Sequence, residues 1–203
     1  MNKEIKAIVF DVGGVLYEES MIPAYKQLSK IFNFDLKEFE RVKAKYYDLA
    51  HTGKISAYKY PYALADELKI KDKKRFVTLW FKSGKKLLQP NKKVIKLLIK
   101  LRKDYDIATL TNITKIHDKI RKQKGIYKNF DLVLVSCREG IKKPDLAFYR
   151  LLIKRLSLHP RQIVFIDDQE KYLKPAKNLG IRTIAFKNNA QLIKDLRKQG
   201  VKT

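Results

Sequence analysis

The alternation of short apolar segments with amphipathic segments most constrains the fold of this chain. Residues 5–10, 106–112, 130–136, 162–168 and 182–186 have the length and apolar content of buried strands. Helical periodicity occupies residues 91–104, 116–126, 144–158, 171–180 and 189–200. Strands that alternate with helices form a parallel sheet covered on both faces. The sequence therefore predicts an α/β protein with a Rossmann-like parallel-sheet core.

A second pattern interrupts this alternation after the first strand. Residues 19–89 are helical by pattern, with aromatic residues at helical spacings and breaks expected near Asn33, Gly53, Lys71 and Gly84. We therefore expect a core domain of residues 1–18 plus 90–203 and an inserted α-helical cap of residues 19–89. One or two cap aromatics are expected to face the functional site, from the set Tyr46, Tyr47, Tyr58, Tyr60, Tyr62, Trp80 and Phe81.

The charge of the chain bears on its partners. The 203 residues include 46 lysines and arginines against 21 acidic residues, a formal net charge of +25. Such a field attracts polyanions and speeds the capture of anionic substrates. Nucleic acid is a possible partner but is not favoured, because no zinc-finger spacing or glycine-aromatic RNA-binding motif accompanies the charge. No apolar run approaches the roughly 20 residues of a membrane helix, so we expect a cytoplasmic protein without a membrane partner.

Polar residues gather where the predicted strands end. They are Asp11 after the first strand, Thr111 and Asn112 after the second, and Asp167 and Asp168 after the fourth. The carboxyl ends of parallel strands line the ligand crevice of an open sheet, so these residues are expected to meet. Lys143 follows the third strand in the segment "GIKKPD" and is expected to join them.

This set of groups suits phosphoryl chemistry. Clustered carboxylates hold Mg²⁺, which usually completes its coordination with water and substrate phosphate. A carboxylate beside that metal can attack phosphorus, while a lysine and backbone N–H groups offset charge on the phosphoryl oxygens. Gly14 would let the backbone approach the phosphate closely.

Four segments resemble a known family in their order along the chain. "FDVGGVL", "LTN", "GIKKPD" and "FIDDQEKYLKPAKNLGI" are similar to the four motifs of the haloacid dehalogenase-like hydrolases. The resemblance extends over the full chain, because that family carries a small helical cap between its first and second motifs. It implies a Mg²⁺-dependent phosphatase acting on a small phosphorylated substrate, although some members are dehalogenases, mutases or phosphonate hydrolases.

The resemblance also implies roles for the carboxylates. Asp11 would be the nucleophile and a metal ligand, and Gly13 would offer its backbone carbonyl to the metal. Asp168 would bind Mg²⁺ directly, and Asp167 directly or through water.

The remaining roles concern the phosphoryl group. Thr111 and Asn112 would bind its oxygens, Gly14 would admit it, and Lys143 would steady both the nucleophile and the phosphate. Lys142 competes for the lysine role, but the motif places that lysine directly before the proline.

Gly13 departs from the family pattern. Most phosphatases of the family carry there an aspartate that protonates the leaving alcohol, a contribution worth about 10²–10⁴-fold. Glu18 or Glu19 could replace it, or the substrate could have a good leaving group, such as an acyl phosphate. The alternative is a phosphate-ligand or nucleic-acid binding protein that has lost efficient turnover. Dehalogenation is disfavoured, because Asp167 and Asp168 would repel an anionic substrate unless a cation lay between them.

A second departure is Tyr172, where several relatives carry asparagine.

We expect a Mg²⁺-dependent phosphohydrolase that acts on a small phosphorylated metabolite through an aspartyl-phosphate on Asp11.

Overall fold

A five-stranded parallel sheet forms the centre of the molecule in the computed structural model, which describes residues 4–18, 21–86 and 89–203. Its strands are β1 (Ala7–Phe10), β4 (Asp106–Thr111), β5 (Leu132–Val135), β6 (Ile163–Asp167) and β7 (Arg182–Ala185). They lie side by side in the order β5-β4-β1-β6-β7. The α/β Rossmann-like fold predicted from the sequence is confirmed.

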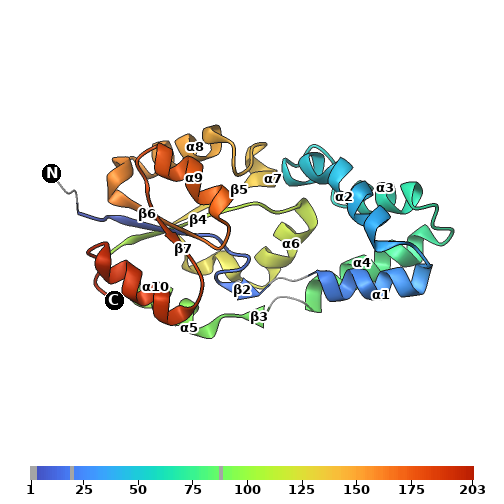
Figure 1. The fold of residues 1–203 in the computed structure, drawn as a ribbon, viewed down its shortest axis with the longest axis horizontal. Helices are drawn as coiled ribbons and strands as arrows, with labels where there is room; N and C mark the ends of the chain where they lie inside the picture. The colour runs from blue at the N-terminus through green and yellow to red at the C-terminus, as the bar shows by residue number, and fades with distance from the viewer. Residues whose placement is uncertain (1–3, 19–20, 87–88) are drawn as a thin grey trace.

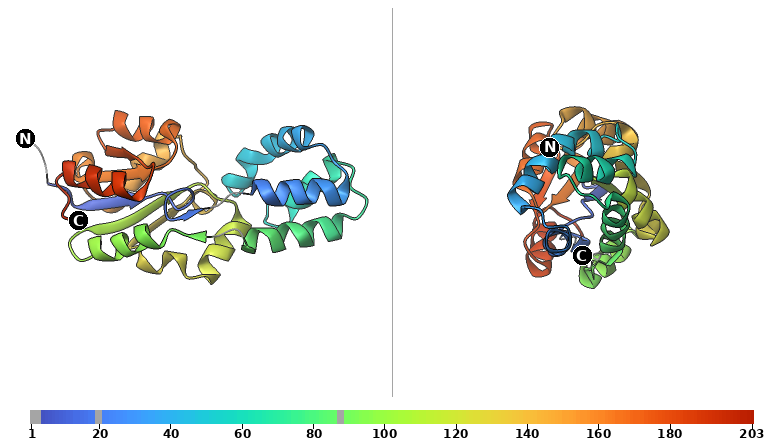
Figure 2. Two further views of the ribbon diagram at one scale, coloured as in Figure 1. Left: turned by 60° about the horizontal axis from the view of Figure 1, so that its bottom comes forward. Right: turned by 90° about the vertical axis from the view of Figure 1, so that its right-hand side faces the viewer.

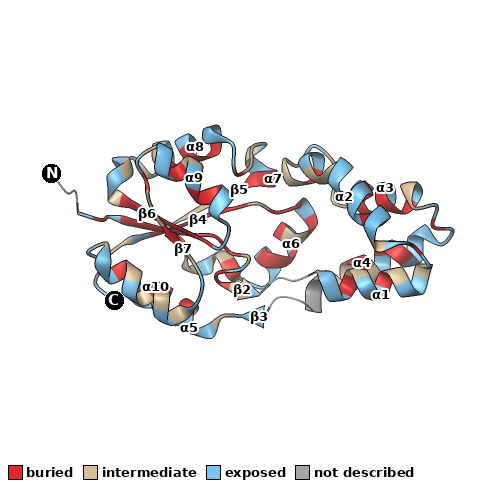
Figure 3. Ribbon diagram, viewed as in Figure 1, coloured by how far each residue is buried: buried red, intermediate tan, exposed pale blue. Residues whose placement is uncertain are grey.

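Helices cover both faces of this sheet. The α5 (Lys92–Leu101) and α10 (Asn189–Lys198) helices lie on one face, and α8 (Leu146–Leu156) and α9 (Glu170–Asn178) lie on the other (Figure 1). Successive side chains of a strand point to opposite faces. Ile8 and Phe10 therefore pack in the core with α5 and α10, while Ala7 and Val9 pack with α8 and α9. All four residues of β1 are buried, and the sheet is the most deeply buried part of the core (Figure 3).

Four helices form a separate lobe beyond the carboxyl ends of the strands. They are α1 (Ile22–Phe32), α2 (Leu36–His51), α3 (Lys59–Glu67) and α4 (Lys73–Lys86), and Figure 2 shows them set apart from the sheet. Aromatic side chains fill this helical lobe, with Phe39 and Trp80 buried at its centre. The break expected near Gly84 comes slightly later in the chain, because α4 continues to Lys86. The boundaries 18/19 and 89/90 between cap and core stay a prediction.

Several further elements connect these parts, and of them only α6 was predicted from the sequence pattern. β2 (Tyr17–Glu18) and β3 (Gln89–Pro90) form an antiparallel pair where the chain leaves the core and returns to it. After β4 come α6 (Lys115–Gln123) and a 3-10 turn at Ile126–Asn129. A second short helix, α7 (Ser136–Glu139), follows β5, and another 3-10 turn at Pro160–Gln162 precedes β6. Among the described residues, no helix is long and apolar enough to cross a membrane.

The helical lobe touches the core at a few well-defined points. Lys142 Nζ pairs with Asp48 Oδ1 of α2 at 3.2 Å and lies 5.4 Å from the centre of the Tyr47 ring. Gly53, just after α2, has a φ of +69°, and a Cβ atom there would stand 2.2 Å from the backbone oxygen of Cys137 in α7. A glycine at this position therefore lets the lobe rest against α7.

Replacing this glycine should weaken the contact between lobe and core. In Gly53→Ala we expect a loss of about 1 kcal/mol for the left-handed backbone, and a further loss of about 1–3 kcal/mol for the overlap with Cys137. Gly140→Ala is the matched control, because Gly140 has a φ of +76° with no atom within 4 Å of the added carbon. Urea unfolding of both variants tests this. Equal losses of unfolding free energy in the two variants would show that the protein relieves the overlap with Cys137 at no cost in stability.

Candidate active site

Three carboxylates meet at the carboxyl edge of the sheet. Asp11 follows β1, while Asp167 ends β6 and Asp168 comes next. The register pairs Phe10 with Ile166, and the backbone N–H of Asp11 donates to Ile166 O at 2.9 Å. One oxygen from each carboxylate lies within 4.8 Å of one from each of the others. The parallel pairing of two neighbouring strands thus produces the acidic cluster that the strand ends predicted.

A buried lysine compensates part of this negative charge. Lys143 is 1% exposed, and its Nζ lies 2.6 Å from Asp167 Oδ2 and 3.3 Å from Asp11 Oδ2. The ring of Tyr172 lies 4.9 Å from the same ammonium. A buried charge is tolerated only when it is paired and hydrogen-bonded, and Lys143 meets that condition. Its neighbour Lys142 turns instead to the helical lobe.

The backbone of Lys143 is held by Asn112, the residue that follows β4. Asn112 Nδ2 donates to Lys143 O at 2.8 Å, and Asn112 Oδ1 accepts from the N–H of Lys143 at 2.8 Å. Asn112 lines the cavity, as expected, but its side chain is engaged in holding the lysine loop. The structure thus gives Asn112 a positioning contact that the sequence reasoning did not foresee.

The Asp11 carboxylate is held in a defined orientation. Its Oδ1 accepts from the N–H of Val12 at 2.7 Å, which leaves Oδ2 facing Lys143. Below it, Thr109 Oγ1 donates to Phe10 O at 2.8 Å, in the middle of the sheet. Asp11 directly follows β1, and this hydrogen bond ties the last residue of β1 to β4, so the backbone that carries Asp11 is anchored in the buried sheet.

The glycine-rich turn after Asp11 gives the cluster its space. Gly14 has a φ of +77°, and a Cβ atom there would lie 2.5 Å from Asp168 Cγ. Only glycine combines this backbone conformation with that close approach. Gly13 lies beside it at the cavity wall and brings no side chain into the site.

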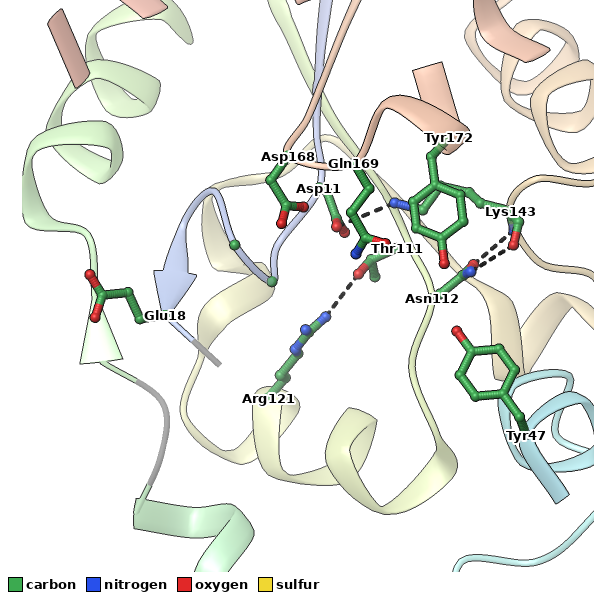
Figure 4. Close-up of a pocket in the computed structure, with 12 residues that line it drawn as sticks. Asp11, Glu18, Tyr47, Thr111, Asn112, Arg121, Lys143, Asp168, Gln169 and Tyr172 are labelled. Atoms are coloured by element: carbon green, nitrogen blue, oxygen red, sulfur yellow. Dashed lines mark hydrogen bonds and ion pairs between the residues drawn. The ribbon is translucent and has the colours of Figure 1, made fainter. Parts of the chain in front are cut away.

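A cavity of about 440 Å³ opens above these groups (Figure 4). Seven residues predicted for the site line it: Asp11, Gly13, Gly14, Thr111, Asn112, Lys143 and Asp168. The eighth, Asp167, is fully buried behind them. Tyr47 of the lobe also lines the cavity, as do Glu18, Arg121, Gln169 and Tyr172. The sequence reasoning assigned no role to Arg121 or Gln169.

Burial and mutual repulsion perturb the acids. Burial, together with the nearby Asp11 charge, raises the pKa of Asp167 to about 6, although Lys143 opposes the shift. Burial and the Asp11 charge also raise the pKa of Asp168 above its usual value. Raised pKa values of two neighbouring acids in a cleft are typical of groups that bind a cation or take part in a reaction. On the lobe side, burial raises the pKa of Tyr47 to about 12, so its hydroxyl keeps its proton.

The fold and the acidic cluster together define a Rossmann-like α/β protein with a site for a cation at the edge of its sheet and a helical lobe beyond that edge. The chain belongs to the haloacid dehalogenase-like hydrolases, because that family's sequence model matches residues 5–180. The same architecture recurs in a HAD family enzyme of Bacteroides thetaiotaomicron, with a TM-score of 0.81 and 22% identity over 91% of this chain and 95% of that one. That enzyme has also been crystallised with magnesium and inorganic phosphate, and this complex gives a TM-score of 0.75 at 22% identity over 90% and 94% of the two chains.

Relatives of known activity match over different lengths. Sesquiterpene phosphatase astK of Aspergillus oryzae is 25% identical over 98% of both chains. Bifunctional epoxide hydrolase 2 of Sus scrofa is 37% identical over 34% of this chain, and the match spans only 13% of that much longer protein.

The raised pKa of Asp167 predicts a pH-dependent affinity for Mg²⁺. As the pH falls through about 6, Asp167 takes up a proton at a pH where an ordinary aspartate stays charged, and that proton competes with the metal. Calorimetric titration with Mg²⁺ should show up to about tenfold weaker binding at about pH 5 than at about pH 7.

Two variants sharpen this measurement. Asp167→Asn should remove the pH-dependent step, whereas Asp195→Asn, a change of an acid on α10 outside the cavity, should preserve it. Equal affinity of the unaltered protein at both pH values would contradict the prediction.

Proposed function

We propose that this protein is a Mg²⁺-dependent phosphohydrolase that cleaves small phosphorylated metabolites through an aspartyl-phosphate on Asp11. The observation that carries the proposal is the oriented Asp11 carboxylate beside a buried lysine and two further carboxylates, at the floor of a cavity. The similarity to a phosphatase over the full chain supports it, as does the likeness to an enzyme crystallised with magnesium and inorganic phosphate.

The donor set fits Mg²⁺. Asp11, Asp167 and Asp168 present three carboxylate oxygens within 4.8 Å of one another, and hard oxygen ligands are those that Mg²⁺ prefers. These three side chains, with the backbone carbonyl of Gly13, are the proposed ligands. When bound, the metal would supply positive charge to the phosphoryl oxygens.

The residues of the chain perform the chemical steps. Asp11 attacks phosphorus, so that a bond forms between its carboxylate oxygen and phosphorus while the bond to the leaving oxygen breaks. Lys143 offsets the charge on the transferred group, and the Thr111 hydroxyl donates a hydrogen bond to one of its oxygens. Water then attacks the phosphorus of the aspartyl-phosphate, which releases phosphate and restores Asp11.

The departure of the leaving group is the step that Gly13 affects. A glycine can neither protonate the leaving oxygen nor activate water. Glu18 lines the cavity, but its carboxylate points away from Asp11 in Figure 4, and Glu19 lies outside the described residues. We therefore propose that the preferred substrates leave as weakly basic anions, as acyl and aryl phosphates do.

The nucleophile can be tested directly. Asp11→Asn should lower the turnover of p-nitrophenyl phosphate by about a thousandfold or more, because the amide cannot attack phosphorus. Chelation of Mg²⁺ should abolish the activity of the unaltered protein. Asp104→Asn, an exposed change in the loop before β4, serves as the control. Failure of the pure, folded protein to hydrolyse either p-nitrophenyl phosphate or acetyl phosphate would sink the proposal and favour a binding function.

The role of the leaving group yields a separate prediction. Acetyl phosphate and p-nitrophenyl phosphate should turn over about 10²-fold faster than glycerol phosphate, the scale of one missing general acid. Gly13→Asp should narrow that gap, since the backbone of Gly13 lies outside the left-handed region that holds Gly14. If the unaltered protein turned over these substrates at rates within about threefold of one another, another group would already protonate the leaving oxygen.

A further inference from the structure

Arg121 is a buried cation beside the phosphoryl site. It lies on α6, is 2% exposed and lines the same cavity as Asp11 and Thr111. Its Nη1 donates to Thr111 Oγ1 at 3.0 Å, and Figure 4 shows the guanidinium rising from α6 toward that hydroxyl. A buried arginine is tolerated when its charge is used or paired, and the Thr111 hydroxyl is one of the partners of Arg121.

The hydrogen bond constrains what the Thr111 hydroxyl can do. A threonine hydroxyl has one proton to donate and two lone pairs to accept with. The Arg121 N–H occupies one lone pair, so the O–H of Thr111 is directed away from the guanidinium and toward another acceptor. Thr111 stands at the cavity wall, where a phosphoryl oxygen would be that acceptor.

The charges of the site also favour a phosphoryl group beside Arg121. Lys143 and a bound Mg²⁺ together neutralise the ionised carboxylates of Asp11, Asp167 and Asp168. Arg121 places a guanidinium at the wall of this cavity, and a guanidinium keeps its charge at any working pH. A phosphoryl dianion in the cavity would therefore have a permanent cation beside it.

We propose that Arg121 is a phosphate-positioning residue, which orients the Thr111 hydroxyl as a donor and raises the affinity of the site for a phosphoryl dianion. The inference rests on the proposed function only in taking the cavity above Asp11 as a phosphate site. It adds a cation from outside the four sequence segments that resemble the family.

A neighbouring arginine provides a matched control. Arg138 of α7 donates to both oxygens of Asp118 at 2.9 and 2.6 Å, and Tyr127 donates to the same carboxylate at 3.0 Å. Asp118 lies on α6, three residues before Arg121, yet neither Arg138 nor Asp118 lines the cavity. Arg138→Met therefore removes an arginine and its ion pair close to α6 without touching Thr111.

The test is a calorimetric titration with inorganic phosphate in the presence of Mg²⁺, which requires no turnover. Arg121→Met should weaken phosphate binding by about tenfold, the usual scale for a hydrogen bond from a charged donor. Arg121→Lys should lose less, because it keeps the charge but not the geometry of the guanidinium. In a Thr111→Val background, Arg121→Met should cost a smaller factor, since the two residues act together.

Several outcomes would overturn the inference. It fails if phosphate affinity in Arg121→Met stays within about twofold of the unaltered protein, if Arg138→Met loses as much, or if the unaltered protein does not bind phosphate. If Arg121→Met does not fold, Arg121→Lys and Thr111→Val carry the same comparison. Phosphate binding that depends on Arg121, without hydrolysis of either p-nitrophenyl phosphate or acetyl phosphate, would uphold this inference and refute the proposed function. Hydrolysis by a protein whose phosphate affinity does not depend on Arg121 would refute this inference and uphold the proposed function.

Discussion

The burial of one ammonium group between two carboxylates governs the arrangement of the whole site. The Lys143 side chain has no exposed surface where it contacts Asp11 and Asp167, and removing either kind of partner would leave an uncompensated charge inside the protein. The surrounding structure serves this contact. Two adjacent parallel strands bring the acids together, and Asn112 clamps the backbone of the lysine from a third strand.

The sequence predicted the strand-end residues well because their position follows from topology alone. An acid directly after a buried strand must lie at the carboxyl edge of the sheet, so Asp11 and Asp167 could be placed without coordinates. Arg121 could not, because α6 reads as a lysine-rich surface helix and its burial depends on how that helix packs against its neighbours. Glu18 shows the opposite failure: it is near Asp11 in the chain, but the β2 strand carries its carboxylate away from the cluster.

The helical lobe marks a similar limit. Aromatic spacing predicted its helices, yet only tertiary packing decides which ring reaches the cavity. Trp80 and Tyr60 are buried in the lobe's own core, and Tyr58 and Tyr62 are exposed, whereas Tyr47 lines the cavity. The rotation of α2 that selects Tyr47 is fixed by contacts with the core, among them the pair between Asp48 and Lys142 and the close approach at Gly53. None of these contacts has a local signature in the sequence.

The two-residue ladder between β2 and β3 has a consequence for the chain entropy of the molecule. Paired strands lie about 4.8 Å apart, so the entry and exit of the helical lobe are held at the separation of neighbouring strands. Closing a long loop costs entropy that grows only slowly with its length, and the ladder fixes the ends of this loop wherever its middle lies. A lobe of different size or shape could therefore be inserted at the same point with almost no change in the free energy that the sheet must contribute to folding.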